Sequence, residues 1–266
     1  MTKLITKRGR EKLRANGKIK YTPFEVDEIR FCNRDPMYFI SRYIKTQHPV
    51  LGATMLPIEK HQVDYINAIN NSKNLIAMLP RQTGMTSKTI AFLLWEALFR
   101  VNQRIIVQGV NVNTTKYMCD LLGFLVDHLP AFLKCSVTTK RRTTVEFENG
   151  SSIVIGVISG NALRGAHYTR LYLDCFALAP DRVQQEVFIA AAPMLAKGRV
   201  VMSSTPNGPT NTFAQIWSNA SKHLGHFTPF KRTVDDLPHA LSWKMARKAQ
   251  MSERDWQREY MCEFIP

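Results

Sequence analysis

A short polar loop at positions 80–87 carries the residues best suited to chemistry. It follows an apolar segment of strand length at 75–79, and an apolar helical stretch begins after Thr86. In such a strand–loop–helix unit, backbone N–H groups and the helix dipole face an anion, as in a phosphate-binding loop. The usual pattern, G-x-x-x-x-G-K-[ST], ends in a lysine for the phosphates and a hydroxyl for Mg²⁺. Gly84 and Thr86 match it but Met85 replaces the lysine, and an ordinary strand–turn–helix connection explains the loop equally well.

Three further features lie where a nucleotide site in an α/β sheet needs them. Asp174 ends an apolar strand at 170–174, the place of a Walker B acid that holds Mg²⁺, with a helix cap or a surface acid as the alternative. The hydroxyls of 203–205 end another strand and can sense phosphate, although turn chemistry before a Pro-Asn-Gly segment also explains them. The guanidinium groups of Arg81 and Arg164 can each bind phosphate through two hydrogen bonds, against the default of ordinary surface arginines.

The charge of the chain points to a polyanionic partner. The 266 residues include 36 Lys and Arg against 21 Asp and Glu, a formal net charge of +15. Nucleic acid is expected first, then an anionic membrane or an acidic protein, and a basic surface that only keeps the chain soluble is the remaining alternative. No apolar run approaches the ~20 residues of a membrane span, and the N-terminus lacks an apolar signal segment, so neither a membrane span nor secretion is expected, and nucleic acid is preferred to a membrane as the partner. Five cysteines without C-x-x-C spacing predict free thiols.

Apolar strands alternate with amphipathic helices along most of the chain, which predicts a largely parallel sheet covered by helices. Strands are expected at 75–79, 104–109, 170–174, 199–204 and 227–231, with a hairpin at 145–158 that turns at Asn149-Gly150. Helices are expected at 24–44 (with a start at Asp35-Pro36), 59–69, 89–99, 113–129, 181–195, 213–221, 241–248 and 253–260.

The distribution of these elements predicts three parts. Residues 1–22 form a basic arm that can lie on a phosphate backbone, or else a solvated tail. Residues 57–211 contain the alternating strands and helices and form the nucleotide-binding subdomain. The flanks, 23–56 and 212–266, form a small and mostly helical second subdomain.

Taken together, these segments resemble the ATPase domain of tailed-bacteriophage terminase large subunits, most closely those of large contractile-tailed phages. The resemblance covers the chain from about Phe31 onward, with the motifs in the order of that family. Its phosphate loop, hairpin, Arg-Gly turn, Walker B segment and coupling motif are similar to segments 80–86, 149–153, 163–165, 171–180 and 203–208.

The resemblance implies an α/β fold of the P-loop NTPase type (ASCE class), with ATP and Mg²⁺ as cofactors. By this similarity Gln62 reads the adenine, Arg81 is an arginine finger, and Thr86 and Asp174 hold Mg²⁺. The nucleotide-binding residues that it implies are Gln62, Pro80, Arg81, Gln82, Thr83, Gly84, Met85, Thr86, Ser87 and Arg164. The residues that it implies for coupling hydrolysis to movement are Ser203, Ser204 and Thr205.

The same resemblance implies a function and its partners. The function is ATP-driven translocation of double-stranded viral DNA into a procapsid, in the cytoplasm of the host cell. The partners are the DNA, a portal protein and a small terminase subunit, with several copies of the chain in a ring on the procapsid. Members of the family continue into a nuclease domain, which is expected to be absent here, so that a separate chain supplies it or none does.

One departure from the family lies in the phosphate loop. Met85 stands at the lysine position, and a thioether cannot neutralise phosphate charge. Losing one electrostatic group of this kind typically costs ~10²–10³ in rate. Lys88 lies one turn further along, on the unsuitable side of the loop by pattern, and Arg81 is the better substitute for the missing charge.

A second departure follows the Walker B acid. Cys175 stands at the position of the catalytic glutamate, and a thiol with a pKa near ~8.5 orients water poorly. The next acids, Asp181 and Glu186, lie in the following loop and helix. Two functions therefore remain: an active packaging motor with a deviant nucleotide site, or a catalytically weakened terminase-like protein that binds DNA or a partner. A third possible function, DNA binding without a nucleotide, requires only the positive net charge of the chain.

Overall fold

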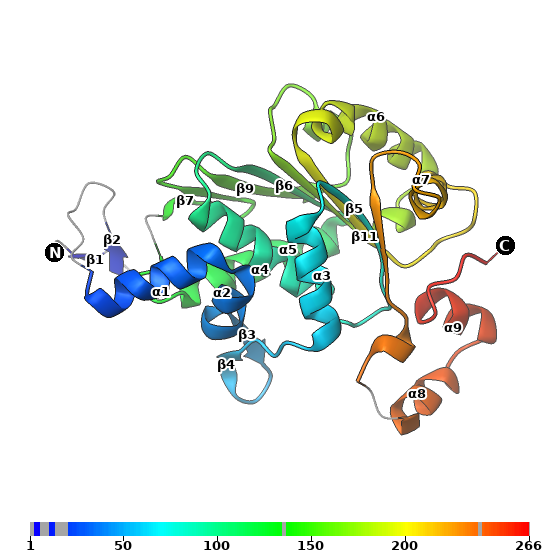
Figure 1. Ribbon diagram of the computed structural model, residues 1–266, viewed down its shortest axis with the longest axis horizontal. Coiled ribbons are helices and arrows are strands. Elements are labelled where there is room, and N and C mark those ends of the chain that lie inside the picture. Colours follow the sequence, from blue (N-terminus) through cyan, green and yellow to red (C-terminus); the bar gives the residue numbers. More distant parts are fainter. Residues whose placement is uncertain (1–2, 6–10, 14–20, 135–136, 239–240, 266) are drawn as a thin grey trace. The chain divides into compact units, whose positions relative to one another are not determined.

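The computed structural model describes residues 3–5, 11–13, 21–134, 137–238 and 241–265 (Figure 1). The chain forms two compact units, each assembled from segments distant in the sequence. The first unit comprises residues 1–58, 87–105 and 117–154, and the second comprises 59–86, 106–116 and 155–266. Within the described ranges, no helix is both long and apolar enough to cross a membrane.

Helices and strands alternate along the described chain. The helices are α1 (Pro23–Arg34), α2 (Pro36–Tyr43), α3 (Lys60–Asn71), α4 (Met85–Phe99), α5 (Val112–His128), α6 (Asp181–Lys197), α7 (Thr212–Ser221), α8 (Leu241–Lys248) and α9 (Glu253–Glu259). The strands are β1 (Lys3–Ile5), β2 (Glu11–Leu13), β3 (Lys45–His48), β4 (Gly52–Met55), β5 (Asn74–Met78), β6 (Arg104–Gly109), β7 (Val137–Lys140), β8 (Thr144–Phe147), β9 (Ser152–Val157), β10 (Arg170–Asp174), β11 (Arg199–Ser204) and β12 (Thr228–Lys231). Eight strands form one sheet in the order β12-β5-β11-β10-β6-β9-β8-β7, while β1–β2 and β3–β4 form separate pairs.

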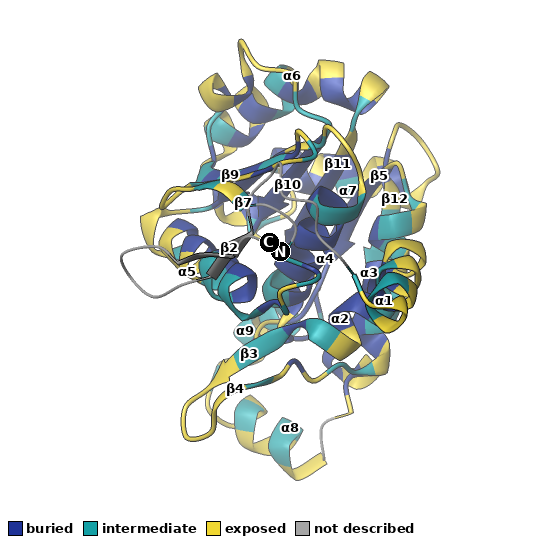
Figure 2. Ribbon diagram, turned by 90° about the vertical axis from the view of Figure 1, so that its left-hand side faces the viewer, coloured by how far each residue is buried: buried dark blue, intermediate teal, exposed yellow. Residues whose placement is uncertain are grey.

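Parallel pairing in the second unit brings the ends of several strands to one edge of the sheet. β11 pairs in parallel with β10 on one side and with β5 on the other, and β12 pairs in parallel with β5. In this register Asp174 lies opposite Ser203, and Ser204 lies opposite Met78. Every residue of β5 and β10 is buried, as expected for strands covered on both faces (Figure 2). The carboxyl ends of β5, β10 and β11 therefore meet where the 80–87 segment begins.

Helices of the second unit cover both faces of these strands. Ile76 of β5 and Leu173 of β10 belong to an apolar core that they share with α6 and α7. Figure 1 shows α6 and α7 on one side of β5 and β11, and α3 on the other. On the α3 side, the ring of Tyr65 lies 5.6 Å from that of Phe230 on β12. This double covering holds the strand ends, and any site built on them, in fixed register.

In the first unit, helix starts follow the predicted capping residues. The carboxylate of Asp35 accepts a hydrogen bond from the N–H of Met37 at 2.8 Å, and Pro36 opens α2. This geometry is the one that the sequence Asp-Pro predicts, because proline lacks the N–H that a helix start leaves unpaired. The indole of Trp95 on α4 donates to the carbonyl of Cys32 on α1 at 2.6 Å, which ties two helices of this unit together.

The predicted hairpin turns at Asn149-Gly150, as expected. The side-chain amide of Asn149 donates to the carbonyls of Ala97, Leu98 and Arg100 at 2.8, 3.1 and 3.2 Å, so it satisfies the free carbonyls at the end of α4. Gly150 has a φ of 79°, which a residue with a Cβ rarely adopts.

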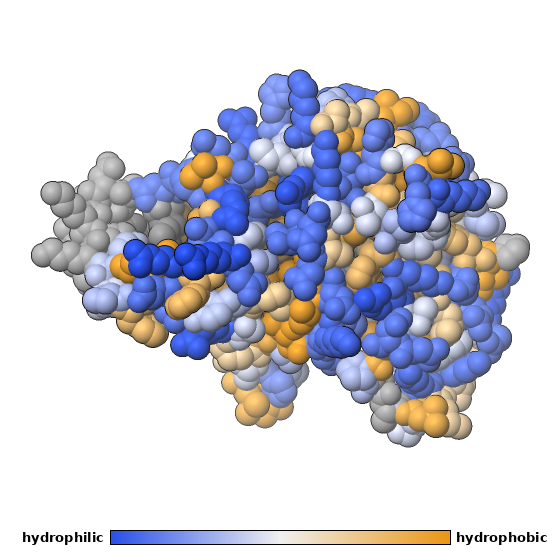
Figure 3. Space-filling view, in the orientation of Figure 1, coloured by the Kyte–Doolittle hydropathy of each residue, from blue (hydrophilic) through white to orange (hydrophobic). Residues whose placement is uncertain are grey.

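Hydrophilic residues cover much of the face drawn in Figure 3, with apolar residues in small groups between them. Among the exposed apolar residues are Val50 and Leu51 in the turn between β3 and β4, and Leu241 and Met245 on α8. Small groups of this kind are ordinary on folded proteins.

Most of the predicted helices and strands are confirmed, with shifts at their ends. The structure adds strands that the sequence does not predict: β7, and the antiparallel pairs β3–β4 and β1–β2. Their sequences, KTQH and VTTK among them, are too polar for a strand signal. Most of the basic arm at 1–22 lies outside the described residues, and β1 and β2 within it pair antiparallel.

Candidate nucleotide-binding site

The 80–86 segment of the second unit folds as a tight loop between β5 and α4. Gln82 and Gly84 have φ angles of 61° and 68°, in the left-handed region. The hydroxyl of Thr83 donates to the carbonyl of Pro80 at 3.0 Å and closes the turn. The backbone thus reverses between Pro80 and the start of α4 at Met85, as the phosphate-loop interpretation requires.

Gln62 of α3 anchors this loop. Its amide nitrogen donates to the carbonyl of Thr83 at 2.8 Å, and its amide oxygen accepts from the N–H of Glu59 at 3.1 Å. The side chain is buried, with 5% of the residue's surface exposed. Both ends of the amide are therefore engaged with the protein, in the place that the family resemblance assigned to adenine recognition.

Asp174 lies at the centre of a buried polar cluster. Its Oδ1 accepts hydrogen bonds from the hydroxyl of Thr86 at 3.1 Å and from the hydroxyl of Tyr172. The Tyr172 hydroxyl also lies 2.9 Å from that of Ser203. Asp174 is 3% exposed, and burial raises the pKa of its carboxyl above the ordinary 3.8, although the hydrogen bonds from Tyr172 and Thr86 oppose this effect. No ion pair of Asp174 is present among the described residues, so its charge lacks a cation.

This cluster fits a magnesium ion bound together with a phosphate. Mg²⁺ prefers oxygen ligands and usually takes only one or two carboxylates, with waters and phosphates completing its shell. Thr86 and Asp174 offer a hydroxyl and a carboxylate side by side. Among the described residues, no group of three or more His, Cys, Asp or Glu side chains is arranged to hold a metal ion.

Cys175 follows Asp174 in an unusual backbone conformation. Its φ is 57°, and its thiol donates to Oδ2 of Asp174 at 3.7 Å. Burial, followed by the negative charge of Asp174, raises the pKa of this thiol to about 12, while the charge of Arg81 acts in the opposite direction. At neutral pH the side chain is thus a neutral thiol, which cannot take a proton from water.

The 203–205 segment connects the loop to the turn that follows β10. The N–H of Leu79 donates to the carbonyl of Ser204 at 3.2 Å. The hydroxyl of Ser204 accepts from the N–H of Ala177 at 3.2 Å. Ser203, Ser204 and Thr205 are all buried. Ser204 is therefore hydrogen-bonded both to the residue before Pro80 and to the 175–178 turn.

Two charged residues near the loop were missed in the sequence, because they belong to helices more than 160 residues further on. The carbonyl of Glu259 on α9 accepts from the N–H of Arg81 at 3.0 Å, and its carboxylate lies 3.6 Å from Nε of Arg81. Arg247 on α8 donates to the amide oxygen of Gln82 at 3.3 Å. Neither residue belongs to a local motif, so only the fold could reveal them.

The other residues assigned from the sequence lie as follows. Met85 is 5% exposed. The guanidinium of Arg164 donates to the side chain of Asn161 in its own turn at 2.6 Å, and no contact with the loop is described for it. The hydroxyl of Ser87, which belongs to the first unit, lies 3.2 Å from that of Tyr117 on α5. Lys88 is buried, with 5% of its surface exposed.

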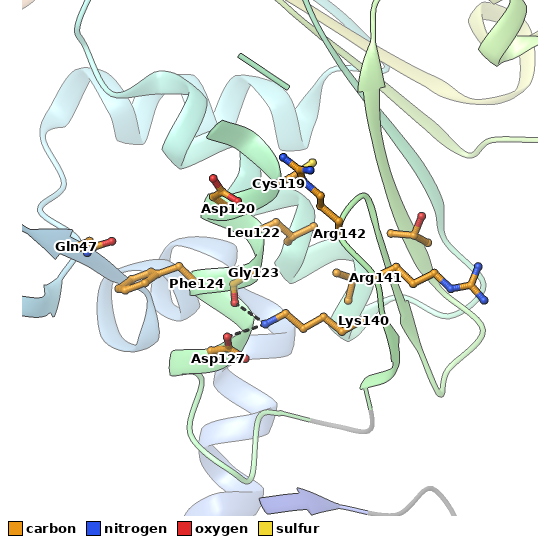
Figure 4. A pocket seen from close by; sticks show the side chains of 12 residues that line it. Gln47, Cys119, Asp120, Leu122, Gly123, Phe124, Asp127, Lys140, Arg141 and Arg142 are labelled. Carbon is orange, nitrogen blue, oxygen red and sulfur yellow. Dashed lines mark hydrogen bonds and ion pairs between the residues drawn. The ribbon is translucent and has the colours of Figure 1, made fainter. Parts of the chain in front are cut away.

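The first unit has a separate cavity of about 420 Å³ between α5 and the β7–β8 turn (Figure 4). Lys140 extends across it and donates to the carboxylate of Asp127 at 2.6 Å and the carbonyl of Gly123 at 3.2 Å. Arg141 and Arg142 are exposed at its rim. The cavity has a basic edge but no pair of hydroxyl and carboxylate like that of Thr86 and Asp174, and no motif in the sequence indicated it.

Comparisons with known proteins identify the family and the fold. Residues 76–266 match the family model of the T4likevirus-type terminase large subunit, N-terminal part. The ATPase domain of the Thermus phage P74-26 large terminase is 20% identical, with a TM-score of 0.63, covering 79% of this chain and 94% of that one. The large terminase of bacteriophage HK97 is 13% identical, with a TM-score of 0.66, covering 87% and 55%. The large terminase of a thermophilic bacteriophage, in complex with ADP, is 15% identical, with a TM-score of 0.60, covering 79% and 54%. The chain thus spans about half the length of the last two, and the expected α/β fold of the ATPase type is confirmed.

Proposed function

The chain belongs to the family of T4likevirus-type terminase large subunits, within their N-terminal part, and from this premise we propose that it binds ATP with Mg²⁺ and drives double-stranded DNA into a viral procapsid. The observation that carries the proposal is the hydrogen bond between Thr86 and Asp174, residues 88 positions apart. It joins the end of the phosphate loop to the end of β10. A nucleotide site needs these two oxygens together, and an ordinary strand–turn–helix connection does not.

In this proposal the loop binds the phosphates of ATP through its backbone N–H groups. Thr86 and Asp174 hold Mg²⁺, whose charge neutralises the negative charge of the phosphates. The large terminase of the thermophilic bacteriophage, which shares this fold, has been solved with ADP, and this supports a nucleotide at the corresponding loop. Gln62 sets the position of the loop through Thr83, and we propose that it approaches the adenine from this position.

Arg81 is placed to act at the phosphates. Its side chain is 66% exposed, and its backbone N–H is anchored on Glu259. A guanidinium suits phosphate recognition because its N–H groups form a planar fork. Ser204 then provides the connection from the loop to β11, through Leu79, and to the 175–178 turn, through Ala177. We propose this connection as the route by which hydrolysis moves the 212–266 flank relative to the 57–211 subdomain.

The alternative function is a catalytically weakened protein that keeps the fold and binds nucleotide, DNA or a partner. One specific observation favours it: the neutral thiol of Cys175, with a pKa of about 12, stands where a carboxylate should orient water. Met85 adds to this deficit, because its side chain carries no charge. ATP turnover by this protein is therefore expected to be slower than in other members of its family. The packaging motor requires measurable turnover, whereas the weakened protein does not.

DNA and further proteins are the proposed partners. The net charge of +15 suits a phosphate backbone, and we place part of the DNA contact at the exposed Arg141 and Arg142 of the first unit. A portal protein, a small terminase subunit and a ring of identical chains are proposed from the family, as is the cytoplasm of the host cell as the place of action.

The deciding experiment compares the purified chain with the double variant Met85→Lys/Cys175→Glu. ATP turnover and binding of a non-hydrolysable ATP analogue are measured for both proteins. Measurable turnover by the unaltered chain, increased by DNA, supports the packaging motor. Binding without turnover, with turnover restored in the double variant, supports the weakened protein. Failure of both proteins to bind the analogue removes the nucleotide proposal altogether.

A further inference from the structure

Arg247 is a cation beside the phosphate loop that has no role in the function proposed above. It lies near the end of α8, and one of its terminal nitrogens donates to the side-chain oxygen of Gln82 at 3.3 Å. Its guanidinium also lies 5.8 Å from the ring centre of Trp243, one turn earlier on the same helix. Gln82 is exposed at the tip of the loop. Arg247 thus reaches the loop from the side of the C-terminal helices.

The neighbouring cations are already paired with carboxylates. Arg81 faces Glu259, whose carboxylate also accepts from Arg258 at 2.9 Å. The two lysines that flank Arg247 on α8 are paired with Asp235 and Glu253, at 3.2 and 2.9 Å. Within the part of the chain that the structure describes, no carboxylate lies within ion-pair distance of Arg247. Its full charge is therefore available to an anionic ligand at the loop.

The loop lacks a cation at the position of the family's lysine. Met85 occupies the lysine position and is buried, so neither charge nor a hydrogen-bond donor comes from that side chain. Backbone N–H groups and the helix start provide only a partial positive charge, about half an elementary charge. Several negative charges on a triphosphate require more than this. Met85 and Arg247 belong to the same unit, and Arg247 is bonded to Gln82, three residues before Met85.

We propose that Arg247 takes over the role of the missing lysine and binds the β- and γ-phosphates of the nucleotide. This inference depends on the proposed nucleotide site. The bond from Arg247 to Gln82 is a single one to a neutral amide, whereas a phosphate offers the guanidinium an anionic acceptor and two parallel hydrogen bonds. Phosphate can therefore displace Gln82 as the partner of Arg247. α8 becomes part of the site, and nucleotide binding draws it toward the loop.

The test measures the affinity of a fluorescent non-hydrolysable ATP analogue with Mg²⁺. Arg247→Ala should weaken binding about 10- to 100-fold, the effect of one hydrogen bond to a charged group. Arg247→Lys, which keeps the charge but loses the planar fork, should lose less. The decisive variant is Arg247→Ala combined with Met85→Lys, in which binding should recover because the lysine resumes its ordinary place. A purely structural role for Arg247 predicts instead that Arg247→Ala weakens binding by the same factor in the Met85→Lys background as in the unaltered chain.

Lys248→Ala is the matched control, since it removes a neighbouring charge on α8 that is already paired with Glu253. The affinity of this variant should equal that of the unaltered chain, and circular dichroism should show the same fold in every variant. Unchanged affinity in Arg247→Ala, or no recovery on adding Met85→Lys, overturns the role of Arg247 while leaving the nucleotide site intact. If Met85→Lys alone binds no analogue, the nucleotide site itself is wrong. The two failures are therefore distinguishable.

Discussion

The hydroxyl of Thr86 donates to Oδ1 of Asp174 across 3.1 Å, in a cluster that excludes most solvent. The parallel pairing of the strands brings these two residues together. β5, β11 and β10 are consecutive in the sheet, so the segment that follows β5 and the last residue of β10 reach the same edge. A buried carboxylate without a cation destabilises the fold, and the same carboxylate favours the binding of a cation.

Asp174→Asn should therefore raise the stability of the nucleotide-free protein while removing its Mg²⁺-dependent binding. Burial raises the pKa of Asp174, so the ionised form costs stability as pH rises through that pKa, and asparagine removes this cost. The expected result is a higher melting temperature at pH 7 that no longer rises on adding Mg²⁺ and ATP analogue. A lower melting temperature, with stabilisation by the analogue retained, would contradict the assignment.

Cys175→Ala should leave turnover within about threefold of the unaltered chain, because a thiol with a pKa of about 12 supplies no base at neutral pH. For the same reason, the pH dependence of the rate between pH 7 and 9 should be the same in this variant as in the unaltered chain. Cys175→Glu should raise turnover, by ~10²-fold or more if the carboxylate orients water. Steady-state ATPase assays at several pH values measure both effects, and a large loss in Cys175→Ala would assign the thiol a direct role.

Gly84→Ala should weaken nucleotide binding and destabilise the fold by about 1–2 kcal/mol, since a residue with a Cβ is strained at its φ of 68°. Gly156→Ala is the matched control, because a Cβ there meets no atom within 4 Å and its φ is outside the left-handed region. Denaturant unfolding and analogue binding measure the two effects. Equal unfolding free energies of the two variants would show that the loop accommodates the Cβ without loss of stability.

Lowering the pH should destabilise the first unit because Glu28 becomes protonated. Burial raises the pKa of this carboxyl, but hydrogen bonds from Tyr43 and Tyr38 and the charge of Arg42 outweigh it, so the pKa lies below the ordinary 4.5. A lowered pKa contributes stability above the ordinary value, and this contribution is lost as pH falls through the folded-state value. Glu28→Gln should be less stable than the unaltered chain at pH 7, with the difference shrinking below pH 4. Thermal unfolding across that pH range measures it, and a constant difference would argue against the carboxylate as the source.

DNA affinity should depend steeply on salt, in part through Arg141 and Arg142. Each phosphate contact contributes about 0.9 to the slope of log affinity against log salt concentration. Arg141→Ala/Arg142→Ala should therefore reduce the slope by about 2 for duplex DNA of any sequence. Arg30→Ala is a control in the same unit, because its charge is paired with Asp27 at 3.1 Å. An unchanged slope in the double variant would place the DNA elsewhere.

The sequence predicted the local parts of the site better than its long-range contacts. Gly84, Thr86 and Asp174 are recognisable because backbone geometry and metal chemistry restrict the residue types at those places. Arg247 and Glu259 are not recognisable, since any exposed helix carries similar charges and only tertiary packing brings them to the loop. The burial of Gln62 against Thr83 was likewise invisible, because a glutamine in an amphipathic helix gives no sign of its partner.

The link between Leu79 and Ser204 is made by main-chain atoms alone, an N–H and a carbonyl. Replacing either side chain by any residue other than proline leaves those atoms in place, so most point variants keep this hydrogen bond. A proline at position 79, which has no N–H, or an ester in place of the amide of residue 79 would remove it. The bond between the ends of β5 and β11 is therefore insensitive to most of the substitutions that the gene can acquire.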